Sequence, residues 1–369
     1  MTPRTLPLAA TAVAAALALA GCGGGSKTGA SGGRSVDVKL TDAGCEPAKL
    51  ELAAGPATFQ VTNDGADAVS EFEILDGDHI VGEVENVAPG LSGHFSLTLK
   101  PGTYTMYCPG GKTERGPLVV TGAAAQASAA AAAAVARYRR YVELQAAALV
   151  TKTRLLVSTL DAGDIEGAKR AYAAARVPYE AIEPVAESFG NLDAAIDARA
   201  GDVPPATWTG FHPIERALWV RGATGSGSLR KKLMADVLEL RRRVGTIELE
   251  PAQVANGSVE LLGEVSKSKI TGEEERYSHL DLVDFEANVD GARAAFESVS
   301  DLVAATRPGL VEQIDARFGD VEAALEPYRQ GDSFVPYTAL TKADTRALSW
   351  SIDALAEPLS QVGAIVEGQ

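Results

Sequence analysis

The hydrophobic and polar positions follow two different periods along the chain, and the change comes near Gly122. Before that residue, short runs alternate between apolar and polar side chains, with Gly, Pro, Asn or Asp between the runs. Such alternation is typical of strands with one buried face. The pattern predicts a small all-β sandwich whose clearest strands are "SVDVKL", "ATFQVTN", "GHFSLTL" and "GTYTMYC".

Beyond Gly122 the apolar residues recur at the spacing of amphipathic helices. An alanine-rich stretch leads into the first helix, and polar or Gly/Pro breaks separate the others. We expect a helical bundle, built as two stacked four-helix bundles. The expected helices span residues 132–159, 165–189, 215–220, 229–248, 251–267, 280–305, 311–328 and 342–362.

The first residues have the features of an export signal, with Arg4 followed by an apolar run that is short for a membrane span. "LAGC", which ends at Cys22, matches a bacterial lipobox, in which the peptide is cut before the cysteine and lipid is attached. An ordinary secretory signal with an unrelated cysteine is the alternative. The lipobox predicts a protein anchored by lipid to the outer face of a bacterial cell membrane, in the periplasm or at the cell surface.

The expected organisation has five parts. A signal peptide (1–21) precedes the lipidated cysteine and a flexible Gly/Ser tether (22–34). The β sandwich (35–121), an Ala-rich linker (122–134) and the helical domain (135–369) follow.

The composition indicates the class of ligand. With 369 residues, of which 46% are hydrophobic, the chain can form two domains with separate cores. Acidic residues outnumber basic ones by 49 to 34, and the net charge is −15. Such a surface attracts cations and argues against nucleic acid as a partner.

Two cysteines remain in the exported part, Cys45 and Cys108. In an oxidising compartment they can form a disulfide, bind a metal, or stay as two buried thiols. Strand alternation turns Met106 to the same side as Cys108, and Glu71 to the same side as Glu73. If Cys45 meets them, the five residues form a mixed set of sulfur and oxygen ligands.

A blue-copper site is not expected in the sandwich. Such a site needs two histidines and a cysteine with an axial methionine. His79 and His94 are not spaced for this arrangement, and we expect both on strand surfaces.

"GFHPIERALW" is the most informative stretch of the helical part. Pro213 fits a first helical turn, so His212 lies at a helix start and Glu215 lies one turn further on the same side. This pair can hold a divalent or trivalent cation, but it supplies only two ligands. In the alternative interpretation His212 caps the helix and Glu215 pairs with Arg216 or Arg221.

Carboxylates elsewhere in the helical part can complete such a site. Glu180 and Glu183 are one turn apart on an expected helix, and Asp197 follows on the next segment. Oxygen ligands of this kind suit hard cations, although a solvated acidic face is the alternative. A later segment adds Glu274, Glu275, His279, Asp281 and Asp284.

Several catalytic motifs are absent from the sequence. It has no HExxH, and "HPIER" carries an arginine where an HxxEH zinc protease has its second histidine. It also lacks GxSxG, and "GATGSGS" lacks the Lys-Ser/Thr of a phosphate loop. These absences argue against a hydrolase.

The lipobox together with "CEP", "EFEIL", "YC", "YEAIEPVAESFG", "GFHPIERALW" and "RYSHLDLVDFEANVDGA" resembles the EfeO family, the extracytoplasmic components of EfeUOB iron-uptake systems. The resemblance covers essentially the whole mature chain. It implies a cupredoxin-like Greek-key sandwich joined to an imelysin-type (peptidase family M75) helical domain. The GxHxxE motif of imelysins is complete here as Gly210, His212 and Glu215.

The resemblance also implies two ligand sets. In the cupredoxin part they are Cys45, Glu71, Glu73, Met106 and Cys108. Cupredoxins at large use histidines, and the departure from that pattern argues against copper electron transfer. In the helical part the implied ligands are His212, Glu215, Glu180, Glu183, Asp197 and Glu275.

The resulting hypothesis is a binding protein that captures ferrous or ferric iron and delivers it to a membrane permease. A copper or iron redox site in the cupredoxin part, with ferroxidase-type activity, is a second expectation, and zinc is expected to bind in vitro. The resemblance implies two partners, a permease with glutamate-rich helices and a haem dye-decolourising-type peroxidase. Membrane contact is expected through the N-terminal lipid alone. The alternatives are a metal-dependent peptidase of the imelysin type and a structural lipoprotein that binds no metal.

Overall fold

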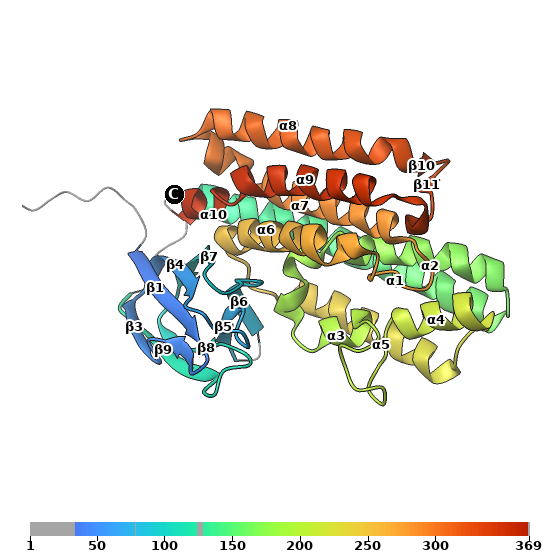
Figure 1. Cartoon of the computed structure of the whole chain (residues 1–369), viewed down its shortest axis with the longest axis horizontal. Coiled ribbons are helices and arrows are strands. Elements are labelled where there is room, and N and C mark those ends of the chain that lie inside the picture. The colour runs from blue at the N-terminus through green and yellow to red at the C-terminus, as the bar shows by residue number, and fades with distance from the viewer. Residues whose placement is uncertain (1–33, 78, 124–127, 368–369) are drawn as a thin grey trace, which may run out of the picture. The chain divides into compact units, whose positions relative to one another are not determined.

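The strands of the N-terminal part form two sheets (Figure 1). The computed structural model describes residues 34–77, 79–123 and 128–367. One sheet has the order β2-β1-β4-β7 and the other β3-β9-β8-β5-β6. The strands are β1 (Arg34–Thr41), β2 (Gly44–Glu46), β3 (Leu50–Ala53), β4 (Gly55–Asn63), β5 (Phe72–Asp76), β6 (His79–Val84), β7 (Ser92–Leu99), β8 (Gly102–Tyr107) and β9 (Arg115–Thr121).

The alternating side chains form the core between these sheets. Val36, Val38 and Leu40 of β1 are buried, while Asp37 and Lys39 between them are exposed. Strand β1 pairs in parallel with β4, which pairs antiparallel with β7. Phe59 of β4 stacks on Phe95 of β7 with ring centroids 5.2 Å apart, and Phe72 of β5 completes the aromatic cluster. The sandwich and its four clearest strands are therefore confirmed.

The remainder of the described chain is mainly helical, as expected (Figure 1). The helices are α1 (Ala129–Asp161), α2 (Ile165–Glu180), η1 (Glu183–Phe189), α3 (Leu192–Asp197), α4 (His212–Arg221), α5 (Gly227–Val244), α6 (Pro251–Lys267), η2 (Lys269–Thr271), α7 (Asp281–Ala304), α8 (Pro308–Leu325), η3 (Glu326–Tyr328), η4 (Tyr337–Ala339), α9 (Lys342–Leu359) and α10 (Val362–Glu367). A short hairpin joins β10 (Arg329–Gln330) to β11 (Ser333–Phe334).

The helices surround two hydrophobic clusters. One is built mainly by α1, α2, α4 and α5, and it includes the fully buried Tyr138 and Leu240. The other is built by α6 to α10, and in it Phe296 of α7 contacts Phe318 of α8. Each such fully buried side chain contributes about 1.5–3 kcal/mol to folding. Helix α7 contributes to both clusters, so it links the two groups of helices.

The expected helix at 165–189 is wrong in one respect that affects the candidate site. Helix α2 ends at Glu180, and the 3-10 helix η1 begins at Glu183. Pro184 has no N–H group with which to continue the helical hydrogen bonds to the Glu180 carbonyl. Asn288 of α7 donates its side-chain amide to that carbonyl instead, at 3.1 Å.

Other helix boundaries also differ from the expectation. The helix predicted at 229–248 ends at Val244, next to Gly245. The one predicted at 342–362 is divided into α9 and α10. The sequence analysis did not predict α3 or the β10–β11 hairpin.

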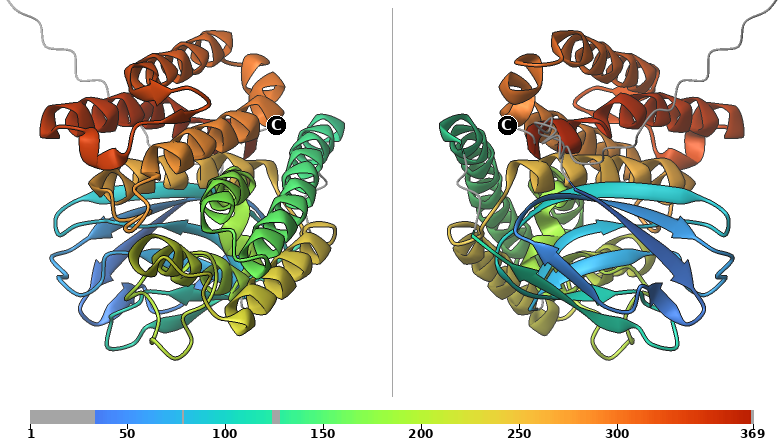
Figure 2. Two further views of the ribbon diagram at one scale, coloured as in Figure 1. Left: turned by 90° about the vertical axis from the view of Figure 1, so that its right-hand side faces the viewer. Right: turned by 90° about the vertical axis from the view of Figure 1, so that its left-hand side faces the viewer.

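The described strands and helices belong to one compact unit, which Figure 2 shows from two sides. Gln253 of α6 donates to the Val81 carbonyl of β6 at 3.0 Å, and Lys100 pairs with Glu248 at 2.8 Å. Among the described residues, no helix combines the length and the apolar character needed to cross a membrane. The lipobox with Cys22 and the tether lie outside the described residues.

Candidate metal centre

His212 is held in place by the loop that precedes α4. Gly210 has a φ of 92°, and a Cβ atom there would lie 2.0 Å from the Ile196 carbonyl oxygen. Phe211 donates its N–H to the same carbonyl at 2.8 Å. Only glycine allows this close approach. The loop therefore lies against the end of α3, and this brings His212 beside Asp197.

The two ring nitrogens of His212 face different groups. Nδ1 lies 3.1 Å from Glu215 Oε2. Nε2 lies 3.5 Å from Asp197 Oδ1 and 3.6 Å from Glu274 Oε1, and it makes no hydrogen bond. The side chain is only 2% exposed. A buried polar atom without a hydrogen-bond partner is costly unless a ligand satisfies it.

Glu215 is held by the segment that precedes α7. Its Oε1 accepts backbone N–H groups from Tyr277 and Ser278, each at 2.7 Å. Arg216, which the alternative interpretation paired with Glu215, lies over the ring of Trp208 at 4.5 Å. That interpretation is wrong for Glu215, and it is also wrong for His212, because the N-cap of α4 is the preceding residue, Phe211.

Arg176 is fully buried at the centre of the acidic residues, and the sequence analysis missed it. It lies on α2, one turn before Glu180. Its position four residues before a glutamate, on the buried face of an amphipathic helix, was the available signal. Its guanidinium forms ion pairs with Glu180, Asp197, Glu274, Glu275 and Asp284.

The carboxylates of Glu180 and Glu183 already form ion pairs and hydrogen bonds with other side chains of the protein. Lys269 Nζ lies 3.1 Å from Glu180 Oε2 and 2.5 Å from Glu183 Oε1. Asn288 donates to both carboxylates, at 2.9 and 2.6 Å. The acidic groups that could hold a metal with His212 do not include these two residues. The structure therefore separates Glu180 and Glu183 from the His212 cluster.

The two adjacent glutamates of the later segment lie on opposite sides of the imidazole. Glu275 groups with Glu215 and His212, and it accepts hydrogen bonds from Tyr172 at 2.9 Å and from Ser278. Glu274 groups with Asp197 and His212. Glu275, which the resemblance implies as the fourth acidic ligand, lies on the Glu215 side of the ring, and Glu274 is the glutamate that faces Nε2.

The charges around His212 favour its protonated form. Burial alone would lower the pKa of His212, but its hydrogen bond with Glu215 and the nearby carboxylate of Glu274 outweigh burial and raise that pKa. Burial would raise the pKa of Glu274, yet Lys269 and His212 hold it well below its usual range. The carboxylate of Glu274 is thus ionised, as a metal ligand has to be.

Other buried carboxyl groups retain protons more readily than usual. Burial raises the pKa of Glu275 well above its usual range, and the charge of Glu215 raises it further. Burial likewise raises the pKa of Asp284 well above the usual range, and that of Asp281 to about 6. The cluster thus contains more acidic groups than its buried cations neutralise.

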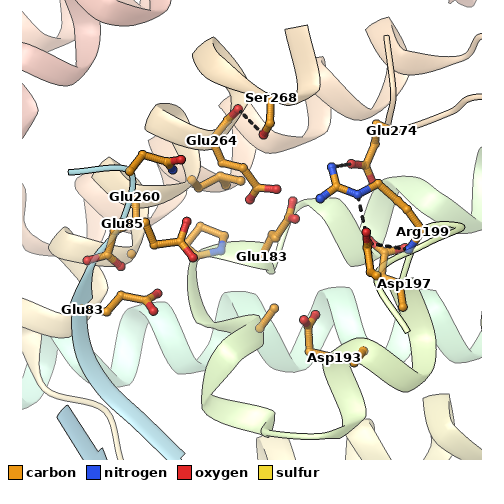
Figure 3. Close-up of a pocket in the computed structure, with 18 of the residues that line it drawn as sticks. Glu83, Glu85, Glu183, Asp193, Asp197, Arg199, Glu260, Glu264, Ser268 and Glu274 are labelled. Carbon is orange, nitrogen blue, oxygen red and sulfur yellow. Dashed lines mark hydrogen bonds and ion pairs between the residues drawn. The ribbon is translucent and has the colours of Figure 1, made fainter. Parts of the chain in front are cut away.

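An acidic cavity of about 470 Å³ adjoins this cluster, and Asp197 and Glu274 form part of its wall (Figure 3). Among the described residues that line it, Arg199 is the only basic one. A concave surface of one charge raises the local concentration of counter-ions. The other acidic residues of the wall are Glu83, Glu85, Glu183, Asp193, Asp202, Glu260 and Glu264.

In the sandwich, Cys45 and Cys108 form a disulfide. Of the three alternatives for this pair, the structure contains the disulfide. The expectation that Cys45 and Cys108 are metal ligands is therefore wrong for this structure, because a thiolate is the form of cysteine that binds a metal.

The other residues expected as ligands in the cupredoxin part do not lie together in one site either. Glu73 lies opposite Tyr107 and Ile74 lies opposite Met106, so Glu73 and Met106 face opposite sides of the sheet. Met106 is fully buried in the core, and Glu71 precedes β5. The expectation for the two histidines is confirmed, because His79 and His94 are exposed on β6 and β7.

Comparison with known proteins identifies two family models and several relatives. The model described as Imelysin (Peptidase_M75) matches residues 134–362, and the model of a Cupredoxin-like domain matches residues 9–120. The "Iron uptake system component EfeO" of Escherichia coli (strain K12) is 39% identical over 342 residues, which cover 90% of this chain and 91% of that protein. The protein of the same name from Shigella flexneri matches to the same extent. A copper-containing nitrite reductase from Thermus scotoductus SA-01 aligns at 18% identity over 24% of this chain and 22% of its own, with a TM-score of 0.19.

Proposed function

Because the chain belongs to the imelysin family, and within it to the EfeO group of iron uptake components, we propose that it binds iron at His212, Asp197 and Glu274. The observation that carries this proposal is the buried Nε2 atom of His212. It has no hydrogen-bond partner and faces two carboxylates at the wall of an acidic cavity. One imidazole and two carboxylates are a ligand set that binds iron in either common oxidation state.

Glu215 acts in this proposal by orienting His212. Its Oε2 accepts the Nδ1 proton, so the lone pair of the neutral ring is on Nε2. Two backbone N–H groups fix the carboxylate of Glu215 itself. Such supporting hydrogen bonds set the tautomer of a metal-binding histidine and raise its basicity. The HxxE motif therefore supplies one ligand and its support, where the sequence analysis expected two ligands.

The charge balance of the cluster also supports cation binding. Arg176 and Lys269 are the buried cations that pair with the surrounding carboxylates. Lys269 holds Glu180 and Glu183 away from the incoming ion, and Arg176, which also pairs with Asp197 and Glu274, keeps the cluster together when no metal is bound. Three protein ligands leave coordination positions for water, which suits an ion that has to be released again.

We further propose that the chain delivers its iron to a membrane permease and acts together with a haem peroxidase of the same uptake system. The relatives are named as components of an iron uptake system, and this supports the proposal. A lipid on Cys22 would keep the protein at the membrane. Redox chemistry at the sandwich has no place in this proposal, because both expected thiolate ligands are consumed in the disulfide.

The peptidase alternative receives less support from the ligand set. Zinc peptidases of the known motif classes hold the metal with two histidines, and the cluster here contains one. We therefore propose a carrier. Incubation of the zinc-loaded chain with casein should release no peptides beyond those released by the His212→Ala variant.

Calorimetric titration of the chain from Arg34 with anaerobic Fe²⁺, with Zn²⁺ and with Cu²⁺ tests the proposal. We expect one iron site per chain, and His212→Ala should weaken iron binding about 100-fold or more, while Glu215→Gln should weaken it about 10- to 100-fold. His94→Ala, which removes an exposed histidine of β7, is the matched control and should bind like the wild type. Equal iron affinity in the His212→Ala and His94→Ala variants would contradict the proposal.

A further inference from the structure

The acidic cavity has walls from both halves of the described chain. Glu83 lies in β6 and Glu85 just after it, while Glu260 and Glu264 lie on α6. Figure 3 shows the two β-side glutamates on one side of the cavity and Glu274 on the other. The sandwich therefore contributes negative charge to a space that the helical part closes.

The cavity adjoins the His212 cluster through two shared carboxylates. Asp197 and Glu274 line the cavity, and the same two carboxylates lie 3.5 and 3.6 Å from His212 Nε2. That nitrogen is buried and makes no hydrogen bond. This nitrogen is a second observation, separate from the acidic lining of the cavity. It points to a bound cation beside His212.

The carboxylates that line the cavity influence one another. Burial raises the pKa of Glu264, and the charges of Glu274 and Glu85 raise it further against the opposing effect of Lys269. Burial raises the pKa of Glu183 well above its usual range, and the charges of Glu264 and Glu274 raise it further. A mobile cation would relieve the mutual repulsion of these carboxylates as it passes.

We propose that the acidic cavity is an entrance vestibule that attracts hydrated metal cations and guides them to His212, with Glu85 of the sandwich and Glu264 of α6 as principal contributors. The inference rests on the proposed function, since it assumes that His212 binds the ion. It gives the sandwich a role that needs neither copper nor electron transfer. The sandwich supplies one wall of the path by which the ion enters.

Arg199 has the opposite effect in this vestibule. Its Nη1 lies 3.3 Å from Glu274 Oε2, and its Nε lies 3.3 Å from Asp202 Oδ2. The guanidinium thus places a positive charge beside one of the proposed ligands. Removing this charge should speed the entry of a cation, whereas removing Glu85 or Glu264 should slow it.

The test is stopped-flow mixing of the chain from Arg34 with anaerobic Fe²⁺, followed by tryptophan fluorescence. Trp208 reports on the site because its Nε1 donates to the Ala198 carbonyl, next to Asp197. At about 0.01 M salt, Glu85→Gln and Glu264→Gln should each lower the association rate constant about threefold, and the double variant about tenfold. Arg199→Gln should raise this constant.

Two matched controls and a salt series complete the design. Glu51→Gln on β3 and Glu312→Gln on α8 remove the same charge from exposed positions that do not line the cavity, and their rate constants should stay at the wild-type value. At about 1 M salt, where the screening length is only about 3 Å, all the rate constants should converge.

Two outcomes would overturn the inference, and they can be told apart. If Glu85→Gln and Glu264→Gln match their controls at low salt while His212→Ala abolishes the fluorescence change, iron binds as proposed but does not use the vestibule. If the fluorescence change persists unaltered in His212→Ala, the proposed function fails, and the vestibule fails with it.

Discussion

At the scale of single residues, Arg176 organises the candidate site. It is fully buried and pairs with carboxylates from α2, α3, α7 and the segment before α7. Taking an arginine out of water is costly, and only several close carboxylates compensate for that cost. The residue is therefore stable in the metal-free protein only because the acidic residues surround it, and they in turn depend on it.

Arg176→Met should lower the free energy of unfolding by about 3–5 kcal/mol, because it leaves several buried carboxylates without their cation. Urea unfolding at neutral pH measures this loss. Arg170→Met on the same helix is the control, since Arg170 is exposed, and its effect should be small. If the two variants unfold at the same urea concentration, Arg176 does not hold the cluster together.

At the scale of elements, the break between α2 and η1 is fixed by two glycines on neighbouring helices. A Cβ atom on Gly257 of α6 would lie 1.9 Å from the Pro184 carbonyl oxygen. One on Gly291 of α7 would lie 2.4 Å from the Ala181 carbonyl oxygen. The two helices therefore approach the backbone of the break directly, and they set the position of Glu183.

Gly257→Ala should displace this break and destabilise the fold, because the contacting atom is backbone and cannot move away alone. Gly263→Ala on the same helix is the control. Nothing lies within 4 Å of its Cβ, and removing a helical glycine should stabilise the protein by about 0.5–1 kcal/mol. Thermal unfolding should move the two melting temperatures in opposite directions. A rise in both would show that α6 is not closely packed at Gly257.

The disulfide is an element-scale constraint on the sandwich, with its cysteines 63 residues apart. A closed loop of this length stabilises a fold by about 4 kcal/mol in the chain-entropy model. Cys45→Ala with Cys108→Ala should therefore lower the urea midpoint substantially, while the iron affinity measured by calorimetry stays unchanged. Loss of a bound iron ion in the double variant would assign a metal to the sandwich.

The sequence predicted most of these elements, because burial on one face imposes a clear period on strands and helices. Helix ends were less accurate. The break after Glu180 depends on Asn288, which is 108 residues away in the sequence. The short helix α3, which positions Asp197, lies in a segment with little periodicity. Contacts of this kind come from the tertiary structure, so the local pattern does not reveal them.

At the scale of the whole molecule, the proton balance links stability to metal binding. Burial would lower the pKa of His212, but its hydrogen bond with Glu215 and the nearby carboxylate of Glu274 raise it. Burial raises those of Glu275, Asp284 and Asp281, the last to about 6. These groups bind more protons in the folded chain than in the unfolded chain, so the metal-free protein loses stability as the pH rises from about 5 to 8.

The metal-free chain should therefore melt at a lower temperature at pH 7.5 than at pH 5.5. Zn²⁺, a redox-inert probe, should raise the melting temperature more at pH 7.5, because it replaces the protons that the cluster holds at low pH. Thermal unfolding with and without Zn²⁺ at both pH values measures this. A larger zinc effect at pH 5.5 would contradict this linkage.

The sequence indicated a histidine and several carboxylates as ligands. It did not show which of the carboxylates lie beside His212 and which lie beside Lys269. Motif spacing grouped Glu180 with Glu183, and the fold turns both toward Lys269. It also favoured Glu275, whereas Glu274 faces the cavity and His212. Which carboxylates lie beside His212 Nε2 depends on residues distant in the sequence, and the local pattern does not reveal it.

The most direct test of the central claim is a crystal structure of the iron-loaded chain with anomalous diffraction recorded at the iron edge. We expect one anomalous peak in direct coordination with His212 Nε2, Asp197 and Glu274, with Lys269 still paired with Glu180 and Glu183. A peak between Glu180 and Glu183 with Lys269 displaced, or a peak in the sandwich, would contradict it.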